Sequence, residues 1–388
     1  MKKILVMLGT RPDAIKMAPV VDCLKRRDSF FDVKVCVTAQ HREMIDQVIR
    51  FFSIQPDYDL NVMKINQTLF RSTSRILLRM KGVLEKERPD MVLVQGDTTT
   101  SFVSSLAAFY LNISIGHIEA GLRTQDKYQP FPEEINRRLT THIADIHFAP
   151  TQIARKNLIT EGIQESKIYV TGNTVVDALL MANKKIQDDS SIQNRLTSLF
   201  DYLRDDYKLI LVTAHRRENF GQGIENICLA LKDIIEKHSN VEIVYPVHLN
   251  PNVQEPVYRI LGVTQNGEKT TDSSGRIHLI KPLSYESFIY LLNKSYLVMS
   301  DSGGLQEETP TLKKPLLLMR NCTERPEAIE AGTALLVGTD RDFILSEVSQ
   351  LLSDKKKYNS MLTDRNPFGD GKAAEKIADS LLSYFNFK

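Results

Sequence analysis

Two acidic residues follow predicted strands in the first half of the sequence. Asp97 comes shortly after the apolar strand predicted at 91–94, and Glu119 directly follows the strand predicted at 113–118. Open α/β sheets bind ligands at the carboxyl ends of their strands, so the two carboxylates are expected at neighbouring strand ends, where together they could act as acid and base. Taken singly, each has a plainer interpretation: Asp97 as a helix N-cap, and Glu119 as an ion-pair partner of Arg123.

A third acidic segment, Pro132-Glu133-Glu134, begins a predicted helix. Proline suits the first helical turn, and the helix dipole alone favours acids at that end, which is the plainer interpretation. Glu133 is nevertheless a third candidate for acid or base catalysis.

Two cations lie where the strand predicted at 4–8 passes into a helix. The segment Gly9-Thr10-Arg11-Pro12-Asp13-Ala14-Ile15-Lys16 joins a glycine turn to a helix N-terminus, which attracts anions. Arg11 and Lys16 could therefore bind phosphate, and a capped helix with two solvated cations is the alternative. The absence of a GxGxxG motif argues against a nicotinamide cofactor.

The second half of the sequence offers a histidine beside two arginines. His215, Arg216 and Arg217 follow the strand predicted at 209–212, where they could reach a diphosphate or a sugar hydroxyl. A histidine exposed at the surface is the plainer interpretation.

A serine and glycine turn follows the strand predicted at 296–299. The segment Ser300-Asp301-Ser302-Gly303-Gly304 opens a helix with its backbone N–H groups, which is the most convincing phosphate cradle in the sequence. Glu308, one turn later, could accept hydrogen bonds from ribose hydroxyls, as acids do in dinucleotide sites. The alternative is an acid on a surface helix.

Two parallel sheets are needed to position these residues, and the sequence predicts both. Short apolar runs alternate with amphipathic stretches, which is typical of βα units. The first half has such runs at 4–8, 33–38, 91–94, 113–118, 146–148 and 168–170. The second half has them at 209–212, 241–245, 277–280, 296–299, 315–319 and 334–337.

The chain of 388 residues is long enough for two domains. We place the boundary at the strand end near 171, which gives domains over 1–171 and 172–365. The Thr-, Ser- and Gly-rich stretch at 264–275 predicts a surface loop, and the amphipathic tail at 373–385 predicts a helix.

Composition excludes several classes of protein. Hydrophobic residues at 42%, charged residues at 25% and a net charge of +2 are typical of a globular protein, without the basic stripe that binds nucleic acid. The four cysteines have no metal-binding spacing, so we expect reduced thiols and no metal. Neither a signal peptide nor a membrane-spanning run is visible, so no membrane association and a cytoplasmic location are expected.

Read together, the motifs resemble the non-hydrolysing UDP-N-acetylglucosamine 2-epimerases of bacteria, from residue 9 to residue 373. The blocks that carry the resemblance are GTRPDAIKMAP, TAQHREM, QGDTTT, GHIEAGLRT, PFPEEINR, TGNTVVDAL, VTAHRREN, YPVHLNPNV, SDSGGLQEE, TERPEAIEAGT and NPFGDGKA. This many blocks in one order make a chance match implausible.

The resemblance implies an α/β fold of the GT-B type: two Rossmann-like, doubly wound domains with the active site in the cleft between them. It also implies that a C-terminal helix, at about 366–388, packs back on the first domain and that the second domain binds UDP. The implied reaction is reversible epimerisation at C2 of UDP-GlcNAc to UDP-ManNAc, by anti elimination of UDP to 2-acetamidoglucal and re-addition. The product would supply cell-surface polysaccharide, no cofactor is required, and a homodimer is the usual state.

The resemblance also assigns roles to individual residues. The acid and base candidates are Asp97, Glu119 and Glu133, with His215 counted among the catalytic groups and among those holding the diphosphate. The UDP and sugar contacts are Arg11, Lys16, Leu283, Phe288, Ser302, Gly303, Gly304, Glu308 and Arg325. A second UDP-GlcNAc can activate bacterial members, through positions that here are Gln40, Gln67, Glu134, Arg216 and His248.

The sequence departs from the family pattern in places. Asp13 replaces the usual glutamate, the stretch at 264–275 is long, and Glu43 stands where glutamine can line the activator pocket. Three alternatives remain open: a sister epimerase acting on another UDP-2-acetamido sugar, such as a diacetamido uronic acid, a GT-B glycosyltransferase, and an inactive nucleotide-sugar sensor.

Overall fold

The computed structural model describes residues 1–38, 42–62, 68–262, 264–266, 269–363 and 365–387. The chain forms two compact units: unit 1 contains residues 1–182 and 368–388, and unit 2 contains residues 183–367. The units divide within a helix, further along the chain than the strand end at 171 where we expected the boundary. Each unit is described by itself.

Unit 1 is built on a sheet in which every pair of neighbouring strands is parallel, in the order β3-β2-β1-β4-β5-β6-β7. Its strands are β1 (Lys2–Leu8), β2 (Phe31–Val37), β3 (Tyr58–Asp59), β4 (Met91–Gln95), β5 (Ser114–Ile118), β6 (Ile146–Ala149) and β7 (Ile168–Val170). The order of the strands along the chain reverses between β1 and β4, and doubly wound folds bind ligands at this switch point.

Helices follow most of these strands, which explains why β4 is buried along its whole length. The helices of unit 1 are α1 (Arg11–Lys25), α2 (Arg42–Phe51), α3 (Leu69–Glu87), α4 (Thr99–Tyr110), α5 (Glu133–Ile143), α6 (Gln152–Thr160), the 3₁₀ turn η1 (Glu165–Lys167), the start of α7 (Thr174–Asp188) and α16 (Ala373–Tyr384).

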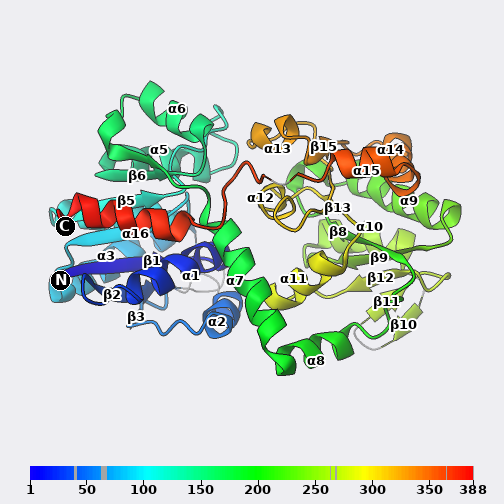
Figure 1. Cartoon of the computed structure of the whole chain (residues 1–388), viewed down its shortest axis with the longest axis horizontal. Coiled ribbons are helices and arrows are strands. Elements are labelled where there is room, and N and C mark those ends of the chain that lie inside the picture. Colours follow the sequence, from blue (N-terminus) through cyan, green and yellow to red (C-terminus); the bar gives the residue numbers. More distant parts are fainter. Residues whose placement is uncertain (39–41, 63–67, 263, 267–268, 364, 388) are drawn as a thin grey trace. The chain divides into compact units, whose positions relative to one another are not determined.

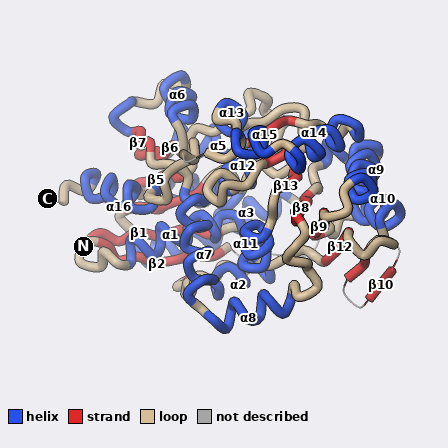
Figure 2. The backbone as a smooth tube through the Cα atoms, turned by 45° about the vertical axis from the view of Figure 1, so that its right-hand side comes forward, coloured by secondary structure: helices blue, strands red, loops and turns tan. Residues whose placement is uncertain are grey.

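The last helix, α16, belongs to unit 1 although unit 2 precedes it in the sequence. It packs against α1, as Figures 1 and 2 show. Asp177 at the start of α7 accepts hydrogen bonds from the first backbone N–H groups of α16, at 3.2 and 2.8 Å. Just before α16, the carbonyl of Phe368 accepts a hydrogen bond of 2.6 Å from the backbone N–H of Asn173.

Unit 2 has a second sheet, in the order β10-β11-β12-β9-β8-β13-β14-β15. Its strands are β8 (Lys208–Thr213), β9 (Val241–Pro246), β10 (Thr264–Asn266), β11 (Lys269–Thr271), β12 (Ile277–Ile280), β13 (Leu297–Ser300), β14 (Leu316–Leu318) and β15 (Ala334–Leu336). Its helices are α8 (Ser190–Leu199), the 3₁₀ turn η2 (Arg217–Asn219), α9 (Gln222–Lys237), α10 (Pro251–Leu261), α11 (Tyr285–Lys294), α12 (Leu305–Glu308), α13 (Pro326–Glu330), α14 (Arg341–Ser353) and α15 (Lys355–Ser360).

The stretch at 264–275 is not only a loop, which corrects the prediction. Strands β10 and β11 pair antiparallel with each other, and β11 pairs antiparallel with β12 at the edge of the sheet. An edge hairpin buries little of its surface, so polar residues are tolerated and the apolar alternation that identifies buried strands is missing.

In both units the sheets are predominantly parallel, so the predicted α/β class is confirmed. Within the described ranges, no helix combines the length and apolar character needed to cross a membrane. The same residues contain no group of three or more His, Cys, Asp or Glu side chains suited to a metal ion.

Candidate active site

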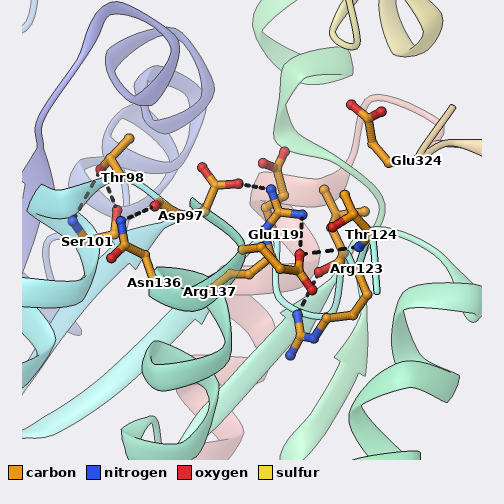
Figure 3. A network of polar contacts seen from close by, with 12 residues as sticks. Asp97, Thr98, Ser101, Glu119, Arg123, Thr124, Asn136, Arg137 and Glu324 are labelled. Atoms are coloured by element: carbon orange, nitrogen blue, oxygen red, sulfur yellow. Dashed lines mark hydrogen bonds and ion pairs between the residues drawn. The ribbon is translucent and has the colours of Figure 1, made fainter. Parts of the chain in front are cut away.

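Asp97 lies just beyond the end of β4, in a network that Figure 3 shows from close by. Its carboxylate forms an ion pair with Arg137 of α5, and its carbonyl accepts a hydrogen bond of 3.0 Å from the side-chain amide of Asn136. The N-cap of α4 is the next residue, Thr98, whose hydroxyl accepts from the backbone N–H of Ser101 at 3.2 Å. Interpreting Asp97 as the N-cap is therefore wrong, and its carboxylate is oriented by α5.

Glu119 occupies a strained position directly after β5. Its φ of 62° lies in the left-handed region, which non-glycine residues adopt at a cost of about 1–3 kcal/mol. The buried carboxylate pairs with Lys16 of α1 and accepts a hydrogen bond of 2.7 Å from the side-chain amide of Asn173, both on Oε2.

Arg123 is not the partner of Glu119, which corrects the alternative weighed from the sequence. Its guanidinium instead makes two hydrogen bonds with the carboxylate of Glu161, at 2.8 and 2.6 Å. The two side chains therefore have separate partners, Lys16 for Glu119 and Glu161 for Arg123.

The ends of β4 and β5 are held close together, which brings the two acids to neighbouring positions. Gly96 has a φ of +64°, and a Cβ there would lie 3.3 Å from Oε1 of Glu119, so a larger residue would press on this carboxylate. His117 contacts the carbonyl of Gly96 through Nε2, at 2.8 Å. Burial lowers the pKa of His117 to about 4, so its ring is neutral at physiological pH.

The start of α1 packs tightly on the start of α4. A Cβ at Gly9 would lie 2.5 Å from the side chain of Thr100, so only glycine fits. The carboxylate of Asp13 accepts hydrogen bonds from the backbone N–H groups of Gly9 and Thr10, at 3.2 and 3.0 Å, and from the hydroxyl of Thr98 at 3.2 Å. Burial raises the pKa of Asp13 to about 7, and the neighbouring charge of Asp97 adds to the rise.

The other predicted residues of unit 1 have different surroundings. Arg11 and Glu133 are the first residues of α1 and α5, and both are half-buried. Glu134 is fully buried and pairs with Arg137 and Arg138, and its carboxylate also accepts from the backbone N–H of Thr124 at 3.2 Å. Two more positions predicted for the activator, Gln40 and Gln67, lie outside the described residues.

In unit 2, His215 follows β8 and is held by Asp301, which follows the neighbouring strand β13. Oδ2 of the buried Asp301 accepts hydrogen bonds of 2.8 Å from the backbone N–H groups of His215 and Arg216. The imidazole of His215 stacks on that of His248, with 5.5 Å between ring centroids. Burial lowers the pKa of His215, with His248 and Arg216 acting in the same direction and Asp301 against them.

The guanidinium of Arg325 lies against the serine and glycine turn at Gly303. A Cβ at Gly303 would lie 2.6 Å from Nη1 of Arg325 and 2.8 Å from Oε1 of Glu324, so glycine is required for this approach. Gly304 is the N-cap of α12, which has a single turn. Ser302 donates its backbone N–H to the hydroxyl of Ser300, at 2.9 Å.

Glu324 connects three arginines of unit 2. Its carboxylate accepts hydrogen bonds of 2.7 Å from Arg325 and Arg320, and a nitrogen of Arg216 lies 3.8 Å away. Burial alone would raise the pKa of Glu324, but Arg325 and Arg320 lower it to about 2. Around this carboxylate the structure gathers two residues predicted for different roles, Arg216 and Arg325.

The remaining predicted residues of unit 2 lie on three elements. Leu283 and Phe288 are half-buried before and within α11. Glu308 is buried in α12. His248 follows β9 and is exposed, and its Nδ1 accepts from the backbone N–H of Asn250 at 3.1 Å.

Four residues that support the predicted site were missed by the reasoning from sequence: Arg137, Asn173, Asp301 and Glu324. Each acts on a partner through the fold: Arg137 on Asp97, Asn173 on Glu119 and Asp301 on His215 are pairs distant in sequence, whereas Glu324 is next to Arg325. Their place two or three residues after a predicted strand was the available signal for Asn173 and Asp301.

Comparisons with known proteins show the family of the chain. The family model described as UDP-N-acetylglucosamine 2-epimerase matches residues 24–382. The UDP-N-acetylglucosamine 2-epimerase of Escherichia coli (strain K12) is 52% identical over 379 residues, which are 98% of each chain. The crystal structure of UDP-GlcNAc 2-epimerase from Neisseria meningitidis bound to UDP-GlcNAc has a TM-score of 0.90 and 48% identity, covering 98% of this chain and 100% of that one.

A co-structure of an S. aureus protein with UDP has a TM-score of 0.86 and 44% identity, and covers 100% of this chain and 98% of that one. These relatives match along nearly their whole length, and the family expected from the motifs is confirmed. The chain therefore belongs to the UDP-N-acetylglucosamine 2-epimerase family.

Proposed function

We propose that this chain interconverts UDP-GlcNAc and UDP-ManNAc by moving a proton at C2 while UDP leaves and returns at C1. The observation that carries the proposal is the pair Asp97 and Glu119, held at neighbouring strand ends by Arg137 and Lys16. Inversion at C2 needs groups that take up and return a proton, and carboxylates in defined orientations supply them.

The elimination step separates into two tasks. A carboxylate takes the C2 proton, and UDP departs with both electrons of its C1–O bond, which leaves 2-acetamidoglucal with a double bond between C1 and C2. UDP then adds again at C1 while a proton reaches the opposite face of C2. Asp97, Glu119 and Glu133 are the groups proposed for these proton transfers.

The leaving diphosphate needs positive charge and N–H donors. We assign this role to unit 2, where His215, the turn at Gly303 and the guanidinium of Arg325 gather around the ends of β8 and β13. Fixed cations stabilise charge that develops in a transition state more effectively than solvent does, since they need not reorganise. Glu324 holds the guanidinium of Arg325 in place.

We also propose that a second UDP-GlcNAc regulates the enzyme through Arg216 and His248. The imidazole of His248 stacks on that of His215, and Arg216 is the next residue in the chain, so a ligand bound by either would act on His215. Glu134, predicted for the same role, is fully engaged with Arg137 and Arg138, so its contribution would be indirect. Sigmoidal dependence of the initial rate on UDP-GlcNAc that disappears in His248→Ala would support this proposal.

A homodimer is our proposed assembly state. Helices α3 and α4, which pack on each other, expose large apolar side chains that include Phe70, Leu78 and Phe109. Covering such residues is a common role of subunit contacts. Light scattering after gel filtration tests the oligomeric state, and Leu78→Asp should shift a dimer towards monomer.

The cytoplasmic location stays a prediction.

Proton NMR in deuterium oxide tests the reaction directly. Incubating UDP-GlcNAc with the protein should produce UDP-ManNAc with deuterium at C2. Glu119→Gln should abolish both the formation of UDP-ManNAc and the incorporation of deuterium, while UDP binding stays measurable. Unchanged UDP-GlcNAc despite tight UDP binding would refute the assignment of this sugar. Turnover of a UDP-diacetamido uronic acid in the same assay would then identify a sister epimerase.

A further inference from the structure

The two oxygens of the Asp301 carboxylate differ in their hydrogen bonds to the described residues. It is fully buried, and Oδ2 accepts from the backbone N–H groups of His215 and Arg216 and from the side-chain amide of Asn219, at 2.8, 2.8 and 3.2 Å. Among the residues that the structure describes, Oδ1 has no hydrogen-bond donor. The imidazole Nδ1 of His215 lies 3.4 Å from this oxygen.

A buried carboxylate oxygen without a donor costs about 1–3 kcal/mol, and more when it is charged. A small rotation of the His215 ring would bring Nδ1 within hydrogen-bond distance and remove this cost. The carboxylate therefore favours the form of the ring with a proton on Nδ1, and Nε2 then faces away from Asp301. The backbone bonds to Oδ2 prevent the carboxylate itself from turning.

The charge on the ring is decided by the groups around it. Burial disfavours the imidazolium most strongly and Asp301 favours it, while the stacked ring of His248 and Arg216 also disfavour it. Burial, His248 and Arg216 together outweigh Asp301, so the pKa of His215 is lowered and its ring is neutral at pH 7.5. An anion at Nε2 would add a second favourable contact and reverse this balance.

We propose that Asp301 is a positioning residue that lets His215 take up a proton when a diphosphate binds, so that phosphate, imidazolium and Asp301 form a chain of charge-assisted hydrogen bonds. The proton comes from solvent and is released when UDP leaves. This inference rests on one part of the proposed function, the binding of UDP by unit 2, because it requires that the diphosphate of UDP contact His215. It adds a reversible positive charge to the fixed charge of Arg325.

Calorimetric titration of UDP at pH 7.5, in two buffers of different ionisation enthalpy, counts the protons taken up on binding. The terminal phosphate of UDP, with a pKa of about 6, is already ionised at this pH. The wild-type protein should take up as much as about one proton per UDP, since a single imidazole changes its charge. His215→Gln should take up none through this group.

Asp301→Asn is the decisive variant. The amide oxygen can still accept from the backbone N–H groups, while the amide N–H₂ faces Nδ1 and makes it an acceptor, so the imidazolium is disfavoured. We expect proton uptake to be lost and UDP affinity to fall about 10- to 100-fold, since a hydrogen bond to a charged group is lost. Added to His215→Gln, the same change should weaken UDP binding little further.

Asp205→Asn, which alters an exposed carboxylate paired at the surface with Lys294, is the matched control and should behave as wild type. Wild-type proton uptake in Asp301→Asn would overturn the inference. If that variant does not fold, ¹⁵N NMR of the histidine rings in the wild-type protein decides instead: UDP must convert His215 from neutral to charged. Proton uptake without epimerisation would refute the proposed function and leave this inference standing.

Discussion

Asn173 offers the sharpest test of how Glu119 is held. The side-chain oxygen of Asn173 accepts from the backbone N–H of Val175 at 3.1 Å, which fixes the amide so that its nitrogen donates to Glu119 at 2.7 Å. Both groups are buried. A hydrogen bond to a charged group contributes about 1.5–3 kcal/mol, so Asn173→Ala should reduce kcat about 10- to 150-fold.

Asn173→Asp should give a different signature. One oxygen keeps the bond to Val175 and the other lies about 2.7 Å from Oε2 of Glu119. Two negative charges at this distance repel by about 6 kcal/mol at an effective dielectric constant of about 20, so the pair binds a proton. Activity relative to wild type should therefore fall as pH rises and recover as pH falls.

The assay is C2 deuterium exchange and product formation in UDP-GlcNAc, followed from about pH 5.5 to 9. Asn183→Asp is the matched control, because the side-chain oxygen of Asn183 also accepts a hydrogen bond, 2.9 Å from Asn293 in unit 2. Asn173→Ala within about threefold of wild type would refute the reasoning, since that is well below the value of such a bond. A pH profile of Asn173→Asp parallel to wild type would refute it as well.

Two further predictions concern acid stability and nucleotide binding. Burial lowers the pKa of His147 to about 3. Between pH 8 and pH 5 this histidine therefore becomes protonated in the unfolded chain but not in the folded protein, and the free energy of unfolding falls by about 2 kcal/mol. His147→Leu should remove this contribution and reduce the fall in Tm between pH 8 and pH 5 by about 4–8 °C, whereas His142→Leu, at an exposed position, should not. Equal falls in Tm for the wild type and both variants would contradict this. Gly303→Ala should displace the guanidinium of Arg325 and weaken UDP binding at least about tenfold with little change in Tm, while Gly223→Ala, whose Cβ has no neighbour nearer than 3.5 Å, should bind normally. Wild-type UDP affinity in Gly303→Ala would exclude a steric role for this glycine.

The sequence predicted the buried part of the fold well because buried parallel strands are short, apolar and separated by helices. Strand β3 was missed because two residues, Tyr58–Asp59, are too short to show a period. Strands β10 and β11 were taken for a loop because an edge hairpin can be polar on both faces. Their polar composition carries no signal of burial.

The candidate site was predicted in part, and the missing part is the set of contacts between distant residues. The strand-end rule identified Asp97 and Glu119, since it depends only on local pattern. It could not show that Glu119 pairs with Lys16, because that contact joins helix α1 to the end of β5, which are far apart in the sequence. Nor could it show that Asp301 supports His215, which requires knowing that β13 and β8 are neighbours. Such pairings are properties of the sheet order.

The return of the chain to unit 1 affects when the enzyme can become active during its synthesis. Asn173 is fixed in part by the carbonyl of Phe368, and a Cβ at Gly172 would lie 3.1 Å from the Cα of Gly369, so the two backbones meet beside the support of Glu119. A ribosome must translate all of unit 2 before residue 368 emerges. Newly made unit 1 therefore lacks its closing segment until then, and we expect a cut near residue 368 to weaken the support of Glu119.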